Sequence, residues 1–148
     1  MIKIKRASID DISQLSEAFD QYRIWYRMES DIEKAKKFLS ERMQSNESII
    51  FLAEEDGKTL GFTQLYPLFS STRMQRLWLL NDLFVYSDHR GKGISKLLIE
   101  AAKKHCLETG GCAVSLETEK NNTIGNILYP KTDFVLNKSH NFYEWSAK

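Results

Sequence analysis

The feature that most constrains the fold is an apolar run that leads through a glycine-rich loop into a helical pattern. The run from Arg76 to Tyr86, RLWLLNDLFVY, is almost continuously apolar, which is typical of a central strand covered on both faces. The loop SDHRGKGIS follows, and from Ile94 apolar residues recur at helical spacing until Gly110 and Gly111. The next stretch, CAVSLETE, is typical of a strand. Strand, helix and strand then form a parallel crossover, which indicates an α/β protein.

Patterns elsewhere predict further elements. We expect a strand over MIKIKRA, a helix capped by Ser8 or Asp10, a second helix from about Asp31 to Met43, and a hairpin around the turn DGKT. A weaker helix over 122–129 follows CAVSLETE, and DFVLN and NFYEWSA are expected to end the chain as strands. The result is a mixed sheet with helices on both sides, in a single domain over residues 1–148.

Composition excludes several function classes. The 148 residues include 21 Lys and Arg against 20 Asp and Glu, and a net charge of +1 offers no general attraction for nucleic acid or anionic lipid. No run approaches the roughly 20 apolar residues that span a bilayer, and no signal peptide is recognisable. Cys106 and Cys112 have neither redox nor zinc spacing, and no histidine has a ligand-spaced partner. We therefore expect a cytoplasmic protein without a metal site, a membrane segment or a nucleic-acid partner.

The loop at Arg90–Gly93, RGKG, has two interpretations. Glycines at a strand-to-helix turn bring unpaired backbone N–H groups close to an anion, and the cationic side chains of Arg90 and Lys92 add attraction for phosphate. The alternative is an ordinary polar turn with solvated charges. The glycines and charges by themselves give the two interpretations about equal weight.

Two blocks together resemble the GNAT family of N-acetyltransferases. The family's acetyl-coenzyme A (acetyl-CoA) motif is Arg/Gln-x-x-Gly-x-Gly/Ala after a central strand, and Arg90, Gly93 and Ser95 stand at its defined positions, with Ser95 departing from Gly or Ala. The block NTIGNILYPKTDF resembles the family's Asn-x-x-Ala-x-x-Leu-Tyr segment, with Asn122 and Tyr129 in register. The motif is especially similar to that of the diamine (polyamine) acetyltransferase branch.

The resemblance implies a fold, a cosubstrate and a set of binding residues. The fold would be the GNAT acyltransferase fold, a mixed, mostly antiparallel central sheet of about seven strands flanked by about four helices. The cosubstrate would be acetyl-CoA. Its pantetheine arm would meet the central strand and Asn122, and its pyrophosphate would meet the loop. The residues so implied are Leu83, Phe84, Val85, Arg90, Gly91, Lys92, Gly93, Ile94, Ser95, Lys96 and Asn122.

The resemblance also implies direct attack of a neutral primary amine on the thioester, without a covalent enzyme intermediate. Tyr129 would be the acid that protonates the departing thiolate, because a phenol pKa of about 10 suits that transfer. A carboxylate inside an apolar strand needs a partner or a function, so Asp82 is the candidate base. The alternatives are a half-buried aromatic for Tyr129 and a loop-fastening carboxylate for Asp82.

The acceptor is expected to be a small-molecule amine, such as a polyamine or an amino-acid-like compound. Tyr22, Tyr26 and Asn81 are the candidate acceptor-binding residues, although core packing explains the tyrosines more readily. The family branch suggests a homodimer. A different class of function, a regulatory module that binds acetyl-CoA without turnover, remains an alternative because Asn81 replaces an acidic residue of that branch.

Overall fold

The central apolar run lies inside a five-stranded sheet. The computed structural model describes residues 1–147 and contains β1 (Lys3–Arg6), η1 (Ile9–Asp11), α1 (Ile12–Trp25), α2 (Ile32–Gln44), β2 (Ile49–Glu55), β3 (Lys58–Ser70), β4 (Gln75–Val85), η2 (Ser87–His89), α3 (Ile94–Glu108), β5 (Val114–Ser115) and α4 (Thr123–Lys131). The sheet order is β1-β2-β3-β4-β5. Neighbours from β1 to β4 are antiparallel, and β4 and β5 are parallel. The chain divides into two compact units, Met1–Glu117 and Thr118–Lys148.

Caps and turns begin the elements of the first unit where the sequence predicts them. Ser8 caps η1 in a capping box with Asp11, and the Asp31 carboxylate accepts a hydrogen bond from the Lys34 N–H at the start of α2. The β2–β3 hairpin turns at Asp56 and Gly57, both with positive φ, which is the backbone that a tight hairpin of this twist requires. The predicted hairpin and both helices are confirmed.

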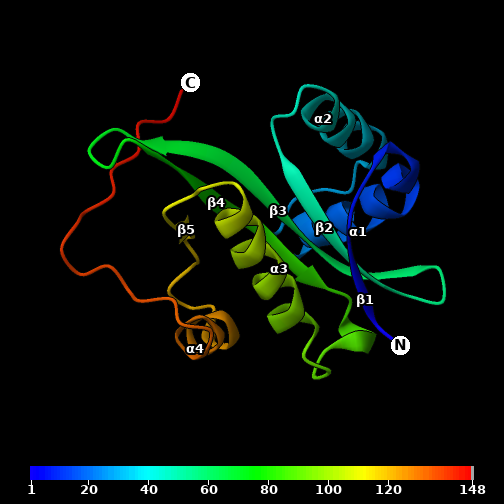
Figure 1. The fold of residues 1–148 in the computed structure, drawn as a ribbon. Helices are drawn as coiled ribbons and strands as arrows, with labels where there is room; N and C mark the ends of the chain where they lie inside the picture. The colour runs from blue at the N-terminus through cyan, green and yellow to red at the C-terminus, as the bar shows by residue number, and fades with distance from the viewer. Residues whose placement is uncertain (148) are drawn as a thin grey trace. The chain divides into compact units, whose positions relative to one another are not determined.

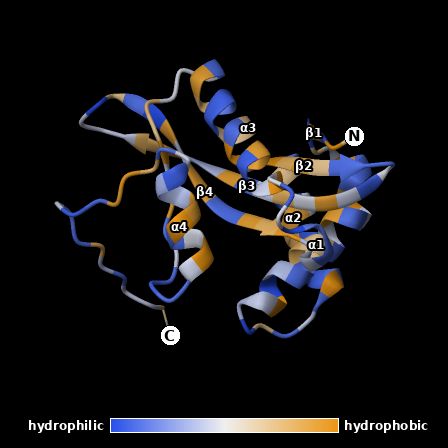
Figure 2. Cartoon of the chain, turned by 90° about the horizontal axis from the view of Figure 1, so that it is seen from below, coloured by the Kyte–Doolittle hydropathy of each residue, from blue (hydrophilic) through white to orange (hydrophobic). Residues whose placement is uncertain are grey.

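Helices cover the two faces of the sheet in the first unit. Leu15 of α1 and Leu39 of α2 pack with Phe62 on one face, and Leu98 of α3 packs with Leu60 and Val85 on the other. Figure 1 shows α3 on the face opposite α1 and α2. Figure 2 shows α3 banded with hydrophobic and hydrophilic residues, as an amphipathic helix is. The central strand is therefore covered on both faces, as its apolar sequence predicts.

The α/β class is confirmed, but the expected number of strands is wrong. CAVSLETE contributes only Val114–Ser115, and DFVLN and NFYEWSA form no strand within residues 1–147. The physical reason is that a strand exists only through its ladder, and within residues 1–147 no ladder forms with the rest of these segments. The four helices are as predicted, and none within the described part of the chain has the length and apolar character needed to cross a bilayer.

Candidate functional site

The loop between β4 and α3 has the backbone of an anion cradle. Gly91 and Gly93 have φ of +80° and +78°, a left-handed conformation that a side chain disfavours, and Gly93 is the N-cap of α3. The first hydrogen bond of the helix runs from the Leu97 N–H to the Gly93 carbonyl. The N–H groups of residues 94–96 precede that bond, so they lie at the positive end of the helix dipole.

The Arg90 side chain is engaged by the protein itself. Its Nε donates to the Val85 carbonyl at 3.0 Å, and its guanidinium lies 5.0 Å from the centre of the Trp25 ring. Arg90 thereby fastens the loop to the end of β4 and to the end of α1. An anion at this turn would therefore contact mainly the backbone of the exposed residues 91–93 and the start of α3.

The strand β4 carries a free edge next to this loop. β4 pairs with β5 at only two positions, Trp78 with Val114 and Leu79 with Ser115. Beyond Leu79, the edge of β4 that faces away from β3 has no strand partner within residues 1–147. Leu83, Phe84 and Val85 lie on this edge. The side chains of Phe84 and Val85 are buried on opposite faces of the sheet, so these residues can meet a ligand only through their main chain. The Val85 carbonyl already accepts from Arg90 and the Phe84 carbonyl lies against Gly61 of β3, which leaves the other main-chain groups of residues 83–85 for a ligand.

A β-bulge places Asp82 in the sheet. Gln64 pairs with Asp82 and Leu65 pairs with Leu80, so Asn81 is the extra residue of β4. A bulge changes the face that the following residues point to. Asp82 consequently stands opposite Gln64, buried at 2% exposure, and Asn81 remains exposed.

The Asp82 carboxylate is held by two amides. Gln64 Nε2 donates to Oδ2 and Asn81 Nδ2 donates to Oδ1, the latter at 2.9 Å. Burial raises the pKa of the Asp82 carboxyl, and these hydrogen bonds oppose the rise. The side-chain amide oxygen of Gln64, Oε1, is buried without a hydrogen-bond partner. The site therefore contains a carboxyl group whose pKa is shifted toward neutrality and whose orientation is locked.

Two of the three predicted acceptor residues, Tyr22 and Asn81, lie beside this carboxylate. The Tyr22 hydroxyl donates to the Asn81 carbonyl at 3.2 Å, and the ring centres of Tyr22 and Tyr26 are 5.1 Å apart. Tyr22 also contacts the core through Phe84. The structure thus brings Tyr22 and Asn81 together beside Asp82, and Tyr26 packs against Tyr22. Tyr22 combines both alternatives considered above, because its ring packs in the core and its hydroxyl reaches the strand.

Asn122 and Tyr129 lie in the second unit. Asn122 is the N-cap of α4: its Oδ1 accepts from the Gly125 N–H at 3.1 Å, and its Nδ2 donates to Thr118 Oγ1 at 2.8 Å. A Cβ at Gly125 would meet the Asn122 Nδ2 at 2.5 Å, which explains glycine where the family motif has alanine. Tyr129 lies near the end of α4, with its ring edge-on to Phe134. The expected helix is confirmed, and the roles of both residues remain predictions.

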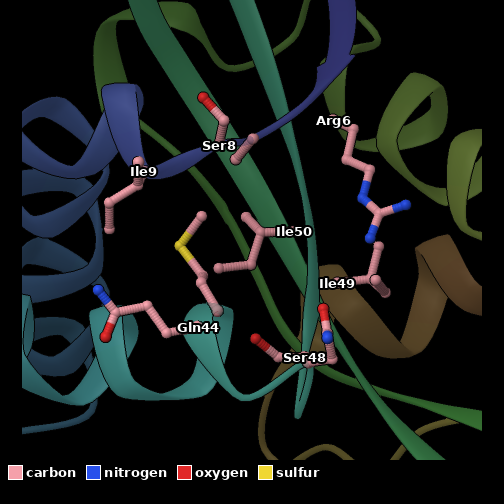
Figure 3. Close-up of a pocket in the computed structure, with 10 residues that line it drawn as sticks. Arg6, Ser8, Ile9, Gln44, Ser48, Ile49 and Ile50 are labelled. Atoms are coloured by element: carbon pink, nitrogen blue, oxygen red, sulfur yellow. The ribbon is translucent and has the colours of Figure 1, made fainter.

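A separate pocket of about 230 Å³ lies between the ends of β1 and α2 and the start of β2. Figure 3 shows Ser8, Gln44, Ser48 and Ile50 around it. None of the predicted site residues lines this pocket, so it is distinct from the candidate site. In the part of the chain that the structure describes, no group of three His, Cys, Asp or Glu side chains is arranged to hold a metal ion.

Sequence reasoning missed one residue of the site, Gln64, and one contact, that of Trp25 with Arg90; Trp25 itself is among the residues of the first helix that the sequence suggests for an acceptor pocket. Gln64 is the cross-strand partner of Asp82, and its polarity within the apolar run LGFTQLYPLF was the available signal. Trp25 is 55% exposed and covers the Arg90 guanidinium. No sequence signal indicates that contact, because it joins residues far apart in the chain.

The site suits a ligand that carries a pyrophosphate and an amide-containing arm. The exposed backbone of the loop and the N-terminus of α3 can bind phosphate oxygens, and Lys92 and Lys96 add positive charge nearby. The free edge of β4 can pair with amides as a neighbouring strand would. These are the chemical parts of acetyl-CoA other than its adenosine and thioester.

Comparisons with known proteins point to one family. The sequence profile of the acetyltransferase (GNAT) family matches residues 12–134. The chain is 41% identical over 133 residues to the uncharacterized N-acetyltransferase YhfO of Bacillus subtilis (strain 168), covering 90% of this chain and 89% of that one. A crystal structure of a probable acetyltransferase superposes with a TM-score of 0.94 at 32% identity, covering 99% of this chain and 98% of that one. A predicted acetyltransferase from Clostridium acetobutylicum, solved with acetyl-CoA, shares the fold with a TM-score of 0.80 at 16% identity, over 97% and 96% of the two chains.

Proposed function

Because the chain belongs to the acetyltransferase (GNAT) family and is an acetyl-CoA-dependent N-acetyltransferase, we propose that its acceptor is the primary amine of a small molecule. Within that class, we propose a polyamine or an amino-acid-like amine. We also propose that residues 1–148 form one N-acetyltransferase domain. The family match supports this, since it runs from 12 to 134 and crosses the boundary at Thr118.

The observation that carries the proposal is the locked carboxylate of Asp82. It lies at the bulge of β4, close to the point where β4 and β5 cease to pair, and Gln64 and Asn81 orient it. Burial raises the pKa of this carboxyl, which makes it a better proton acceptor than a solvated aspartate. An amine that arrives as ammonium must lose a proton before it can attack a thioester, and Asp82 is the group proposed to take it.

The chain's own residues divide the remaining work. Acetyl-CoA supplies the activated acetyl group. The N–H groups of residues 91–96 hold its pyrophosphate, and the main chain of residues 83–85 holds its pantetheine arm. The amine nitrogen forms the new bond to the acetyl carbon as the carbon–sulfur bond breaks. Asp82 takes the first proton of the ammonium through a water molecule, since its side chain is 2% exposed, and Tyr129 gives a proton to the leaving thiolate. The second nitrogen proton, released as the amide forms, restores the Tyr129 phenol through solvent.

The aromatic side chains near Asn81 favour a cationic acceptor. The rings of Tyr22 and Tyr26 are half-buried, with centres 5.1 Å apart, and the Tyr22 hydroxyl donates to the main-chain carbonyl of the exposed Asn81. A ring face attracts an ammonium group, and the amide oxygen can accept a hydrogen bond from it. We therefore assign Tyr22, Tyr26 and Asn81 to acceptor binding. These features support a polyamine or an amino-acid-like compound, both of which carry ammonium groups.

The proposal is tested by incubating the protein with acetyl-CoA and a panel of amines, and by following the release of free thiol. The panel contains polyamines, amino acids and their esters, and neutral hydroxylated amines. Turnover confined to small primary amines is the expected result. Silence across the whole panel, combined with tight acetyl-CoA binding by calorimetry, would instead favour a module that binds acetyl-CoA without turnover. A homodimer and a cytoplasmic location remain predictions.

A further inference from the structure

The side chain of Trp25 joins the helix that carries the tyrosines assigned to the acceptor to the loop assigned to acetyl-CoA. Trp25 is the last residue of α1, and the centre of its ring lies 5.0 Å from the guanidinium carbon of Arg90. Arg90 follows η2 as its C-cap and stands directly before Gly91 of the loop. No step of the acyl transfer proposed above uses this contact, so its purpose is a separate question.

The contact sets the direction in which Arg90 presents its charge. A guanidinium carries its N–H donors in one plane. The Nε–H of Arg90 donates to the Val85 carbonyl at 3.0 Å, and the guanidinium carbon lies over the Trp25 ring. Among residues 1–147, no group accepts a hydrogen bond from the terminal nitrogens Nη1 and Nη2. Both nitrogens are therefore oriented by the protein and left for the oxygens of an anion.

The way α1 ends holds Trp25 in this place. The Met28 N–H donates to the Arg23 carbonyl at 3.0 Å, and the Arg27 N–H donates to the Ile24 carbonyl at 2.9 Å. Arg27 is left-handed, with φ of +67°, so the helix closes in a Schellman motif directly after Trp25. The Trp25 side chain is 55% exposed, and core packing therefore does not account for its position. The ring instead packs on a cation of the neighbouring loop.

We propose that Trp25 is a positioning residue, which acts through Arg90 and couples acetyl-CoA binding to the acceptor end of α1. This inference rests on the proposed function of the loop as the pyrophosphate site. Trp25 holds the guanidinium ready for phosphate, which lowers the cost of ordering a long side chain when the anion binds. A bound phosphate in turn immobilises Arg90 and, through the ring, the end of α1 that carries Tyr22 and Tyr26. Such a coupling acts equally in both directions.

Calorimetric titration of the full-length protein with acetyl-CoA measures the effect on affinity. Trp25→Leu should weaken binding about three- to tenfold, as expected when one long side chain has to be ordered on binding. Trp25→Phe should restore most of the affinity, because it keeps a ring over the guanidinium. Phe69→Leu is the matched control: Phe69 is 73% exposed, and its ring centre lies 4.9 Å from the Arg76 guanidinium carbon. It removes the same kind of contact outside the loop and should leave the affinity unchanged.

A double-mutant cycle shows whether Trp25 acts through Arg90. Arg90→Lys keeps the positive charge and removes the planar guanidinium. In that background Trp25→Leu should cause little further loss of acetyl-CoA affinity, because the group that it positions is already gone. Additive losses would mean that Trp25 contacts acetyl-CoA itself, and they would overturn the positioning role.

Hydrogen exchange with and without saturating acetyl-CoA measures the coupling. In the wild type and in Trp25→Phe, acetyl-CoA should slow exchange both in the loop, over residues 91–97, and at the end of α1, over residues 22–28. In Trp25→Leu it should slow exchange in the loop alone. A merely structural Trp25 would change exchange at residues 22–28 by the same factor whether or not acetyl-CoA is bound.

The outcomes separate this inference from the proposed function on which it rests. If Trp25→Leu bound acetyl-CoA as tightly as the wild type, or still showed slowed exchange at residues 22–28 on binding, the role of Trp25 would be wrong. Gly93→Val then distinguishes the two cases. Abolished binding in Gly93→Val would refute the role of Trp25 alone, whereas unchanged binding would show that the loop is not the pyrophosphate site and would refute both.

Discussion

Replacing Asp82 with asparagine changes one charge and almost no volume. The side chain is 2% exposed, and both of its oxygens accept hydrogen bonds from amides. In the Asp82→Asn variant the new amide nitrogen needs an acceptor, and a rotated Gln64 amide can present the oxygen that now has no partner. We therefore expect the variant to fold. Its effects should come from the lost proton acceptor and the lost buried charge.

The expected loss of activity follows from the role of a general base. Removing such a group lowers kcat/KM by about 100- to 10,000-fold, which is about 3 to 5 kcal/mol of transition-state stabilisation. In the wild type, kcat/KM should fall as the pH drops through the raised pKa of Asp82, because the protonated carboxyl cannot accept a proton. The variant should lose this acid limb. Thiol release measured from pH 5 to 9 gives both results.

The stability of the wild type should depend on pH in the opposite sense to its activity. The pKa of Asp82 is raised in the folded state above its ordinary value of 3.8. The favourable contribution of its protonated form is fully present below the unfolded pKa and is lost as the pH rises through the folded pKa. Asp82→Asn removes this loss, so its free energy of unfolding, relative to that of the wild type, should rise across the same window. Urea unfolding at a series of pH values measures the difference.

A buried carboxylate outside the site provides the control. Asp20 is also 2% exposed and accepts hydrogen bonds from Ser30 Oγ at 2.6 Å and from the Asp31 N–H at 2.8 Å. Asp20→Asn should lower the unfolding free energy by about 1 to 3 kcal/mol, because it breaks a charge-assisted network, and should keep the acid limb of kcat/KM. If Asp82→Asn retained that limb and most of its turnover, Asp82 would be a structural residue and the proposed base would be refuted.

Three further substitutions test other parts of the site. Gly93→Val should lower the free energy of unfolding by about 1 to 2 kcal/mol, because residue 93 has a left-handed backbone. It should also abolish tight acetyl-CoA binding in calorimetry. The control Gly57→Val, at an equally left-handed position in the β2–β3 turn, should cost similar stability and leave that affinity unchanged. Tyr129→Phe should mainly lower kcat and leave acetyl-CoA affinity intact, and a collapse of that affinity would make Tyr129 a binding residue. Gly61→Ala would drive a Cβ into the Phe84 carbonyl, so denaturation should show a loss of about 1 to 3 kcal/mol, and an unchanged midpoint would contradict the close packing of β3 on β4.

Local sequence patterns predicted the helices, strands and turns that are set by interactions between neighbouring residues or by a periodic apolar face. Five features lie within a few residues of their predicted positions: the helices α1 and α2, the hairpin at Gly57, the central strand β4 and the glycine turn into α3. Each depends on side-chain periodicity, a cap or a required left-handed backbone. These are properties of neighbouring residues, so they can be read along the chain.

The prediction of two strands at the C-terminal end was wrong because a strand does not depend on neighbouring residues alone. DFVLN and NFYEWSA have strand composition, but a strand also needs a ladder from a distant segment, and composition says nothing of whether that segment is present. A pattern of this kind predicts the ability to pair and leaves the partner undefined.

By itself, the sequence determined the order of the elements, the glycine loop that starts α3, and the two motif blocks that identify the family. The tertiary structure decided which groups meet. The bulge at Asn81 sets Asp82 against Gln64, and α1 brings Tyr22 to Asn81 and Trp25 to Arg90. These contacts depend on strand register and on helix packing across the sheet. A shift of one residue in register would turn Asp82 to the other face, and no local pattern specifies that shift.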